Sequence, residues 1–409
     1  MDEKNNTTKH LRALYLFAGE RKKLEREWQE GIMPDSHLIG FNHLHEFGVE
    51  ASYIENRFLN WIRKKNFNLT NLFLIPILRR YDIVFSGASL LLPFVAKVVL
   101  RLKRPKFVWY NTFFTNALKR NKNNKFRLWA FRKTIGSLDA IVCPSTAQRK
   151  FLIAEGFDPA KIFFVPNGID IAFMEYDLRS RRISLLPTPF APAMYMNTFW
   201  SQYSSAPRTA SDCVGPTEKK KSEENASVKN AEPFILSVGK DMGRDYATLA
   251  KAVSGLPIRV KVAALSRNFR DIENIPDNLE ILGSVPFPKL VELYKQALFV
   301  VIPTKSEEHL DASDCSGQYV LLDAMSLAKA IVASRRETLD DYFEDGVDGI
   351  IVEPENPVAL REAITALLKN PEKARAVGER AEKKAERRFT TKKLGEGLSI
   401  LFKKIATKN

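Results

Sequence analysis

Two basic residues, Lys240 and Arg244, occupy a polar turn that follows a short apolar run. The local sequence is PFILSVGKDMGRDYATLAKA, so the apolar run ends at Gly239 and a helical pattern begins near Asp245. The first turn of a helix offers backbone N–H groups to an anion, and side-chain cations add charge-assisted hydrogen bonds. These features suit a phosphate or a diphosphate, although a solvated pair of cations explains them equally well.

A second stretch places a carboxylate shortly after a helix start built from small and polar residues. In SDCSGQYVLLDAMSLAKAIVAS, Ser316, Gly317 and Gln318 open a predicted helix that carries Asp323, and an apolar strand follows. The N–H groups of such a helix start can donate to an anion. The carboxylate can accept hydrogen bonds from a pair of sugar hydroxyls. This stretch therefore predicts a binding site for an anion and a sugar.

Short apolar runs alternate with helical stretches on both sides of these motifs. Strands are predicted at 11–18, 49–54, 82–86, 106–110, 139–143 and 161–165, and again at 234–238, 258–264, 279–282, 298–302, 330–333 and 349–352. The helices predicted between the strands of the first half lie at 36–47, 69–80, 87–102, 117–135 and 145–155. Alternation of strands and helices indicates parallel sheets that are covered on both faces. Two such series predict an α/β chain with two doubly wound domains.

The length of 409 residues also favours two domains. We predict one Rossmann-like domain over residues 1–176 and a second over residues 233–388, with a final helix at 389–409. Residues 177–232 are predicted to be an irregular, partly disordered linker, because LLPTPFAPAMYMNTFW is broken by prolines and TEKKKSEENASVKNAE is polar and of low complexity. Ligands of parallel α/β domains bind at the carboxyl ends of the strands, so we expect the site to face the cleft between the domains.

Several motifs that mark other protein classes are absent from the sequence. It contains no G-x-x-x-x-G-K-[ST], no G-x-G-x-x-G and no H-E-x-x-H, which argues against a P-loop NTPase, a dinucleotide oxidoreductase and a zinc protease. The three cysteines show no C-x-x-C spacing, which fits a reducing compartment. The polar start and the lack of an unbroken apolar run of about 20 residues argue against a secretory signal and a transmembrane helix. We expect a cytoplasmic protein.

Positive charge is concentrated in one segment of the first half. The formal net charge is +15, and residues 57–133 hold 18 Lys and Arg but a single acid, Asp82. A solvated basic face, a nucleic-acid surface and an anionic membrane surface remain open. Because aromatic residues accompany the charge and no nucleic-acid motif does, we favour the membrane and expect no nucleic acid. The predicted contact is the helix at 117–135, through Lys119, Arg120, Lys122, Lys125 and Trp129.

Taken together, four blocks of the second half and one block of the first resemble a known family. The blocks of the second half are the two stretches quoted above, LEILGSVPFPKLVELYKQALFVVIPT and FEDGVDGIIVEPENPVALREAI. The first half contributes LDAIVCPSTAQRKFLIAEGFDPAKIFFVPNGIDIAFM. In this order and spacing they resemble the GT-B glycosyltransferases, specifically glycosyltransferase family 4. The resemblance covers residues 138–173 and 233–393 well and residues 11–110 loosely.

The resemblance implies a GT-B fold with a C-terminal helix that returns to the N-terminal domain, and a retaining hexosyltransferase that needs neither metal nor cofactor. The C-terminal domain would bind the nucleotide-sugar donor, and the N-terminal domain the acceptor. Lys240 and Arg244 match the basic pair that acts on the donor diphosphate, and Asp323 matches the second acid of the E-x7-E motif, expected on the ribose. Cys315 occupies the position of the first acid, so backbone N–H groups and the Gln318 amide are expected to hold the donor instead. The implied donor-binding residues are Gly239, Gly283, Val285, Ser316, Gly317, Gln318, Tyr319 and Asp323.

Three functions remain open from the sequence. The first is transfer from a UDP- or GDP-sugar to a lipid-linked glycan or another membrane-associated acceptor in cell-envelope glycan synthesis, by a peripheral protein on the inner face of the cell membrane. The second is transfer to a soluble acceptor. The third is a sugar-nucleotide epimerase, or a non-catalytic binding protein, on the same fold.

Overall fold

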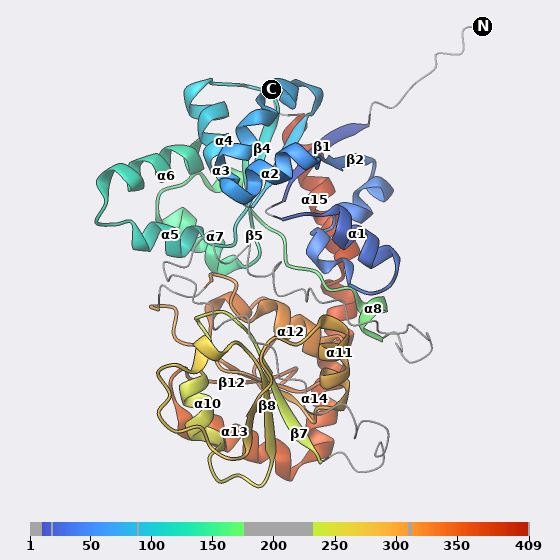
Figure 1. Cartoon of the computed structure of the whole chain (residues 1–409), viewed down its shortest axis with the longest axis vertical. Helices are drawn as coiled ribbons and strands as arrows, with labels where there is room; N and C mark the ends of the chain where they lie inside the picture. The colour runs from blue at the N-terminus through green and yellow to red at the C-terminus, as the bar shows by residue number, and fades with distance from the viewer. Residues whose placement is uncertain (1–9, 18, 88–89, 176–231, 310–312, 408–409) are drawn as a thin grey trace, which may run out of the picture. The chain divides into compact units, whose positions relative to one another are not determined.

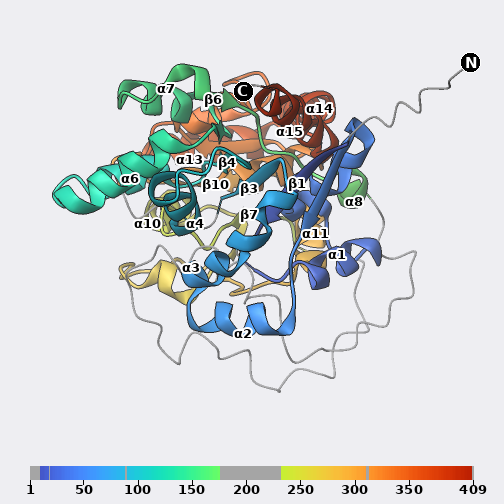
Figure 2. The same ribbon diagram turned by 90° about the horizontal axis from the view of Figure 1, so that it is seen from above.

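The computed structural model describes residues 10–17, 19–87, 90–175, 232–309 and 313–407. The segment 177–231, for which a linker is predicted, lies outside the described residues. The chain divides into two compact units, Met1–Phe173 with Arg388–Asn409, and Met174–Arg387. Each unit is built on one parallel sheet, as predicted (Figures 1 and 2).

The sheet of the first unit has the strand order β2-β1-β3-β4-β5-β6. Its strands are β1 (Leu11–Leu16), β2 (Val49–Tyr53), β3 (Ile83–Ser86), β4 (Lys106–Tyr110), β5 (Ala140–Cys143) and β6 (Ile162–Phe164). The central strands are almost entirely apolar, which suits burial on both faces. All four residues of β3 and of β5 are buried.

The helical elements of the first unit are shorter than the sequence predicts. They are α1 (Lys22–Gln29), η1 (Asp35–Leu38), η2 (Phe41–Phe47), α2 (Arg57–Lys65), α3 (Phe67–Thr70), η3 (Asn71–Arg80), α4 (Leu91–Pro93), η4 (Phe94–Val99), α5 (Phe114–Arg120), α6 (Lys125–Ser137), α7 (Thr146–Ala154), η5 (Pro159–Lys161) and α8 (Ile171–Glu175). The single helix predicted at 117–135 is wrong, because Asn124 caps a new helix by accepting a hydrogen bond from the Arg127 N–H at 2.9 Å.

The last helix, α15 (Thr391–Ala406), completes the core of the first unit. Its apolar face packs with β1 and β3 residues, through Leu394, Leu398 and Phe402. Gly40 lies so close to this helix that a Cβ there would come within 2.8 Å of the Gly395 nitrogen. Gly40 also has φ +71°, a conformation that favours glycine, and it splits the helix predicted at 36–47 into η1 and η2.

A buried polar network fixes the beginning of α15. The Asp35 carboxylate accepts hydrogen bonds from the Thr391 hydroxyl at 3.0 Å and the Asn42 amide at 2.7 Å, and it bonds to the His43 ring at 2.9 Å. The hydrogen bond to Asp35 raises the pKa of His43. Residues at opposite ends of the sequence are therefore joined within one unit.

The sheet of the second unit has the order β12-β11-β10-β7-β8-β9. Its strands are β7 (Phe234–Val238), β8 (Arg259–Ala263), β9 (Leu279–Ile281), β10 (Val300–Ile302), β11 (Ile331–Ser334) and β12 (Ile350–Val352). The chain order reverses between β7 and β10, the point at which an open α/β sheet binds its ligand. The carboxyl ends of these strands are thus the expected place for a site.

Helices cover both faces of this second sheet. They are α10 (Tyr246–Val253), η8 (Ser266–Phe269), α11 (Phe287–Gln296), α12 (Gln318–Met325), η9 (Glu337–Leu339), α13 (Pro357–Lys369) and α14 (Pro371–Arg388). In Figure 1, α10 and α13 lie on one side of the sheet and α11 on the other. The predicted doubly wound α/β architecture is confirmed for both units.

A close approach of α14 to the turn before β11 gives a test of this packing. A Cβ on Gly378 would overlap the carbonyl oxygen of Ala328, whereas a Cβ on Gly136 of α6 meets nothing within 4 Å. Alanine is the better helix former by about 1 kcal/mol at either position. We expect Gly378→Ala to destabilise the second unit by about 1–3 kcal/mol through overpacking, and Gly136→Ala to be neutral or stabilising. Urea denaturation of the two variants measures the difference, and equal effects would contradict the packing.

Candidate functional site

Arg244 lies buried at the carboxyl end of β7, between two glycines. A Cβ on Gly239 would overlap the Arg244 guanidinium, and a Cβ on Gly317 would lie 3.5 Å from its Nη1. Both glycines have positive φ, 151° and 93°. The guanidinium thus rests against the backbone of both sequence motifs and brings them together. A side chain at Gly239 would force the guanidinium out of this position.

The Arg244 guanidinium carries unsatisfied hydrogen-bond donors. The residue is only 5% exposed, and its Nε and Nη1 atoms find no acceptor among the described residues. The sequence predicts a residue in a polar turn, but the structure buries it. Buried polar groups are nearly always hydrogen-bonded, and a buried charge without a partner is costly. An anionic ligand would supply the missing acceptors.

Lys240 lies closer to solvent on the same turn. Its Nζ donates a hydrogen bond to the Ser284 hydroxyl at 2.8 Å, which places the turn next to Gly283 and Val285, the loop after β9. Burial, and then the charge of Arg267, lower the pKa of Lys240. Lys240 and the Gly283–Val285 loop are therefore brought together, as the resemblance implies for a shared site.

Arg267 is a cation of this edge that the sequence analysis did not identify. It lies on η8, directly after β8, and its Nε is buried without a hydrogen-bond acceptor among the described residues. Its position at the carboxyl end of a strand was the available signal. No motif marks it, because SRNF resembles ordinary loop sequence.

The start of α12 differs from the expectation for a donor-binding helix. Gln318 is fully buried, and its Nε2 donates a hydrogen bond to the Thr338 carbonyl at 2.8 Å, so this end of its amide is committed to the fold. The contact of Gln318 with the donor stays a prediction. The N–H groups of Ser316 and Gln318 are also used, donating to the Ser313 and Cys315 carbonyls. The buried Ser316 hydroxyl has no partner among the described residues, and Tyr319 is half-buried.

Asp323 lies inside the second unit rather than at its surface. Burial raises the pKa of Asp323 to about 7, and the hydroxyl of the neighbouring Tyr294 opposes this rise. Tyr294 of α11 is itself fully buried. With this pKa, the carboxyl group changes its charge near neutral pH.

The basic and aromatic residues predicted to face a membrane are exposed on α5, α6 and the turn between them. Phe126 is 75% exposed and Trp129 48%, and their rings stack with centroids 5.9 Å apart. Arg120, Lys122 and Lys125 are also exposed, whereas Lys119 lies over the Phe151 ring at 5.6 Å.

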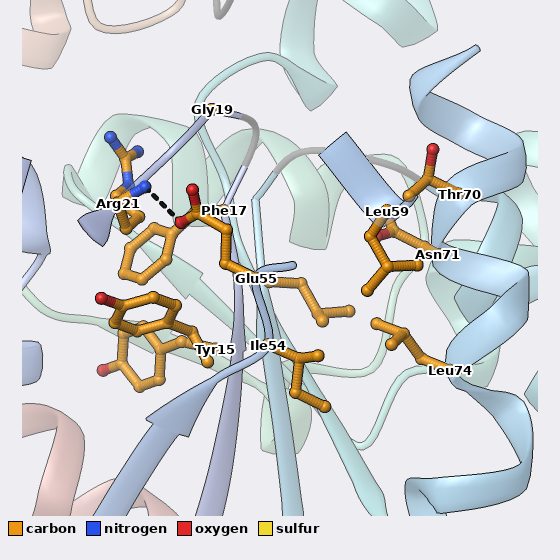
Figure 3. A pocket seen from close by; sticks show the side chains of 12 residues that line it. Tyr15, Phe17, Gly19, Arg21, Ile54, Glu55, Leu59, Thr70, Asn71 and Leu74 are labelled. Atoms are coloured by element: carbon orange, nitrogen blue, oxygen red, sulfur yellow. Dashed lines mark hydrogen bonds between the residues drawn. The ribbon is translucent and has the colours of Figure 1, made fainter. Parts of the chain in front are cut away.

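A small pocket lies at the carboxyl ends of β1 and β2 in the first unit (Figure 3). Its wall includes the rings of Tyr15 and Tyr53, and the Glu55 carboxylate, which accepts a hydrogen bond from the Arg21 backbone N–H at 2.8 Å. Asn71 also lines it, and the Nδ2 of this buried side chain has no partner among the described residues. The sequence analysis did not identify this pocket, because its polar residues come from three separate stretches of the chain.

Within the described ranges, no group of His, Cys, Asp and Glu side chains is arranged to hold a metal ion. The helices that the structure describes include none long and apolar enough to cross a bilayer.

Comparison with protein-family models gives two matches. Residues 35–173 match the model described as Glycosyltransferase Family 4, and residues 267–384 match Glycosyl transferases group 1. The chain is also similar to two uncharacterized glycosyltransferases of Methanocaldococcus jannaschii. One is 25% identical over 42% of this chain and 46% of the relative, and the other is 22% identical over 83% and 81%.

Solved structures share the fold over nearly the whole chain. HepE of Anabaena, in complex with UDP and glucose, aligns with a TM-score of 0.61 at 13% identity, over 96% of this chain and 99% of that one. Sucrose-phosphate synthase from Thermosynechococcus elongatus aligns with a TM-score of 0.64 at 15% identity, over 97% and 99%. The fold and the family matches define a glycosyltransferase. The two family-model matches, together with the shared fold, support a GT-B glycosyltransferase of the family 4 type.

The raised pKa of Asp323 predicts how the stability of the second unit depends on pH. The folded state holds the proton between the ordinary pKa of 3.8 and about 7, so unfolding becomes easier as pH rises through this window. Asp323→Asn, which cannot ionise, should lose much of this decline. Each tenfold difference in proton affinity corresponds to about 1.4 kcal/mol.

Urea denaturation between pH 5 and pH 8 measures the effect. The exposed Asp271→Asn variant is the matched control and should follow the parent chain. A parent and an Asp323→Asn variant with the same pH dependence would contradict the buried, protonated state.

Proposed function

We propose that this protein transfers a hexose from a nucleoside-diphosphate sugar, a UDP- or GDP-sugar, to an acceptor with retention of the anomeric configuration. One observation carries the proposal. The buried guanidinium of Arg244 offers two unsatisfied N–H donors at the edge of the second sheet where the chain order reverses. A diphosphate supplies both the charge and the acceptors that this group lacks.

The chemistry follows from the charge that develops on the leaving group. Breaking the sugar–phosphate bond leaves a nucleoside diphosphate with additional negative charge and an oxocarbenium-like sugar. Cations and N–H groups held in place before the reaction stabilise that charge best. Arg244 and Lys240 are the proposed residues, with Arg244 buried and Lys240 closer to solvent.

The anomeric configuration is retained if the acceptor hydroxyl attacks the sugar from the same face from which the leaving group departs. A phosphate oxygen of the departing diphosphate then takes the acceptor proton, so the reaction needs no protein nucleophile. Lys240 and Arg244 would neutralise the negative charge of the departing diphosphate, a task that a metal ion performs in other enzymes. We therefore propose a reaction that needs neither a metal ion nor a cofactor. Asp323 is proposed to accept hydrogen bonds from the ribose hydroxyls, and Gly239, Gly283, Val285, Ser316, Gly317 and Tyr319 to line the donor site.

The similarity to HepE supports the choice of donor, because that protein is described in complexes with UDP and with UDP-glucose. A sugar-nucleotide epimerase and a non-catalytic binding protein are the alternatives. An epimerase changes the donor without an acceptor, and a binding protein releases no product. Incubation with a panel of UDP- and GDP-sugars, followed by analysis of the nucleotide and of the sugar, separates the three.

Removal of either cation should weaken the binding of the donor and slow transfer. Loss of one charged hydrogen bond costs about 1.5–3 kcal/mol, so Lys240→Ala should lower nucleoside-diphosphate affinity by about 10- to 150-fold. Lys251→Ala, on the exposed face of α10, is its matched control and should bind like the parent. Arg244→Gln tests the buried group, and its melting temperature without ligand shows whether it folds. The assignment is wrong if both Lys240→Ala and a folded Arg244→Gln bind UDP and GDP as the parent does.

For the acceptor, we propose a lipid-linked glycan of the cell envelope, met by a cytoplasmic protein that lies on the inner face of the membrane. Basic residues attract anionic headgroups, and exposed aromatic rings enter the interface. Phe126 and Trp129 on α6 combine both features with Lys122 and Lys125. A second exposed aromatic group on α2 and η3 contains Phe58, Trp61 and Phe73, of which Phe58 and Phe73 meet edge to face.

Vesicle flotation tests the membrane proposal. We expect the protein to float with vesicles that contain anionic lipid, and much less with neutral vesicles, because only anionic headgroups attract the basic residues. The assay uses low salt, because at physiological salt this attraction fades within about 8 Å. Reversal of Lys119, Arg120, Lys122 and Lys125 to Glu should release it without slowing donor hydrolysis. Phe126→Ser should weaken the salt-resistant part, while Ile400→Ser, also exposed in the first unit, should not. Equal binding to both kinds of vesicle, or to neither, would favour the soluble acceptor.

A further inference from the structure

Arg267 lies at the same sheet edge as Lys240 and Arg244. Strands β7 and β8 are parallel neighbours, and Val238 pairs with Ala263, so both strands end side by side. Lys240 follows the end of β7 by two residues, and η8 follows the end of β8. The chain therefore delivers basic residues from two adjacent strands to one place.

The residues next to Arg267 fasten η8 to the turn that carries Lys240. The Asn268 amide donates to the Asp241 carbonyl at 3.2 Å, and its oxygen accepts from the Leu265 N–H. The Phe269 ring stacks on Tyr246 with centroids 4.9 Å apart and an interplanar angle of 13°. Because Asn268 and Phe269, the two residues that follow Arg267, are fixed in this way, the backbone at Arg267 is held beside the turn.

The three cations lack a salt-bridge partner within the part of the chain that the structure describes. Among the described residues, no Asp or Glu forms an ion pair with Lys240, Arg244 or Arg267. The charge of Arg267 also opposes protonation of Lys240. Like charges placed close together destabilise a fold, so this arrangement costs stability as long as no anion is bound. Function can justify such a cost where packing does not.

We propose that Arg267 is a third cationic ligand of the diphosphate, acting beside Lys240 at the end of β8. The proposal rests on the proposed function, since it names a further contact of the same donor site. A nucleoside diphosphate carries two or three negative charges, and a guanidinium can donate two parallel hydrogen bonds to one phosphate. Lys240, Arg244 and Arg267 would then match the charge of the leaving group.

The experiment compares Arg267→Gln with Arg270→Gln, an exposed arginine three residues further on. The probes are UDP, GDP and inorganic pyrophosphate, which is independent of the base, and affinities are measured by calorimetry. We expect Arg267→Gln to lose about 10- to 100-fold in affinity for pyrophosphate and for the nucleotide that the parent binds. Arg270→Gln should bind like the parent, and Arg267→Lys should recover part of the loss.

Thermal unfolding without ligand separates a ligand contact from a structural role. Because Arg267 repels Lys240, the ligand-free Arg267→Gln variant should melt at the same temperature as the parent or higher, while the shift induced by UDP or GDP shrinks. A lower melting temperature without ligand would assign Arg267 a structural role and overturn the proposal.

The outcomes also distinguish a failure of the Arg267 contact from a failure of the proposed donor site. If Arg267→Gln binds all three probes like the parent while Lys240→Gln loses affinity, the inference falls and the proposed donor site stands. If the parent binds none of the probes, both fall.

Discussion

The arrangement of the second unit depends on one buried guanidinium. Arg244 occupies the space that a side chain at Gly239 would fill, and its Nη1 lies 3.5 Å from where a Cβ on Gly317 would be, so two segments more than 70 positions apart pack against it. The group is costly to bury, because two of its N–H donors lack acceptors among the described residues. This cost would be offset by an anion bound at the edge of the sheet.

Charge at this edge is organised by backbone geometry rather than by ion pairs. Parallel strands end at the same edge, so residues that follow β7, β8 and β9 reach one place: Lys240, Arg267 and Ser284. The neighbours of these residues hold the loops, as Asn268 and Phe269 do for η8. The residues proposed to bind the donor and the residues that hold the loops therefore lie within a few positions of each other in the chain.

The first unit depends on a contact between distant parts of the chain. The Asp35 carboxylate joins Asn42 and His43 to Thr391, and α15 then supplies apolar side chains to the core beneath β1 and β3. The pocket at the ends of β1 and β2 lies in the same unit. A chain without α15 would expose this core and the hydrogen-bond network of Asp35 at the start of the helix.

The sequence alone determined the two parallel sheets and the family, because apolar strands that alternate with helices admit few other folds and the motif blocks keep their order. It also predicted that Lys240, Gly283 and Val285 belong to one site. Only the tertiary structure decided that Arg244 is buried, that the Gln318 amide is committed to Thr338, and that the helix expected at 117–135 is two helices. It alone revealed Arg267, because burial, side-chain partners and the meeting of strand ends depend on neighbours remote in the chain, which local patterns do not encode.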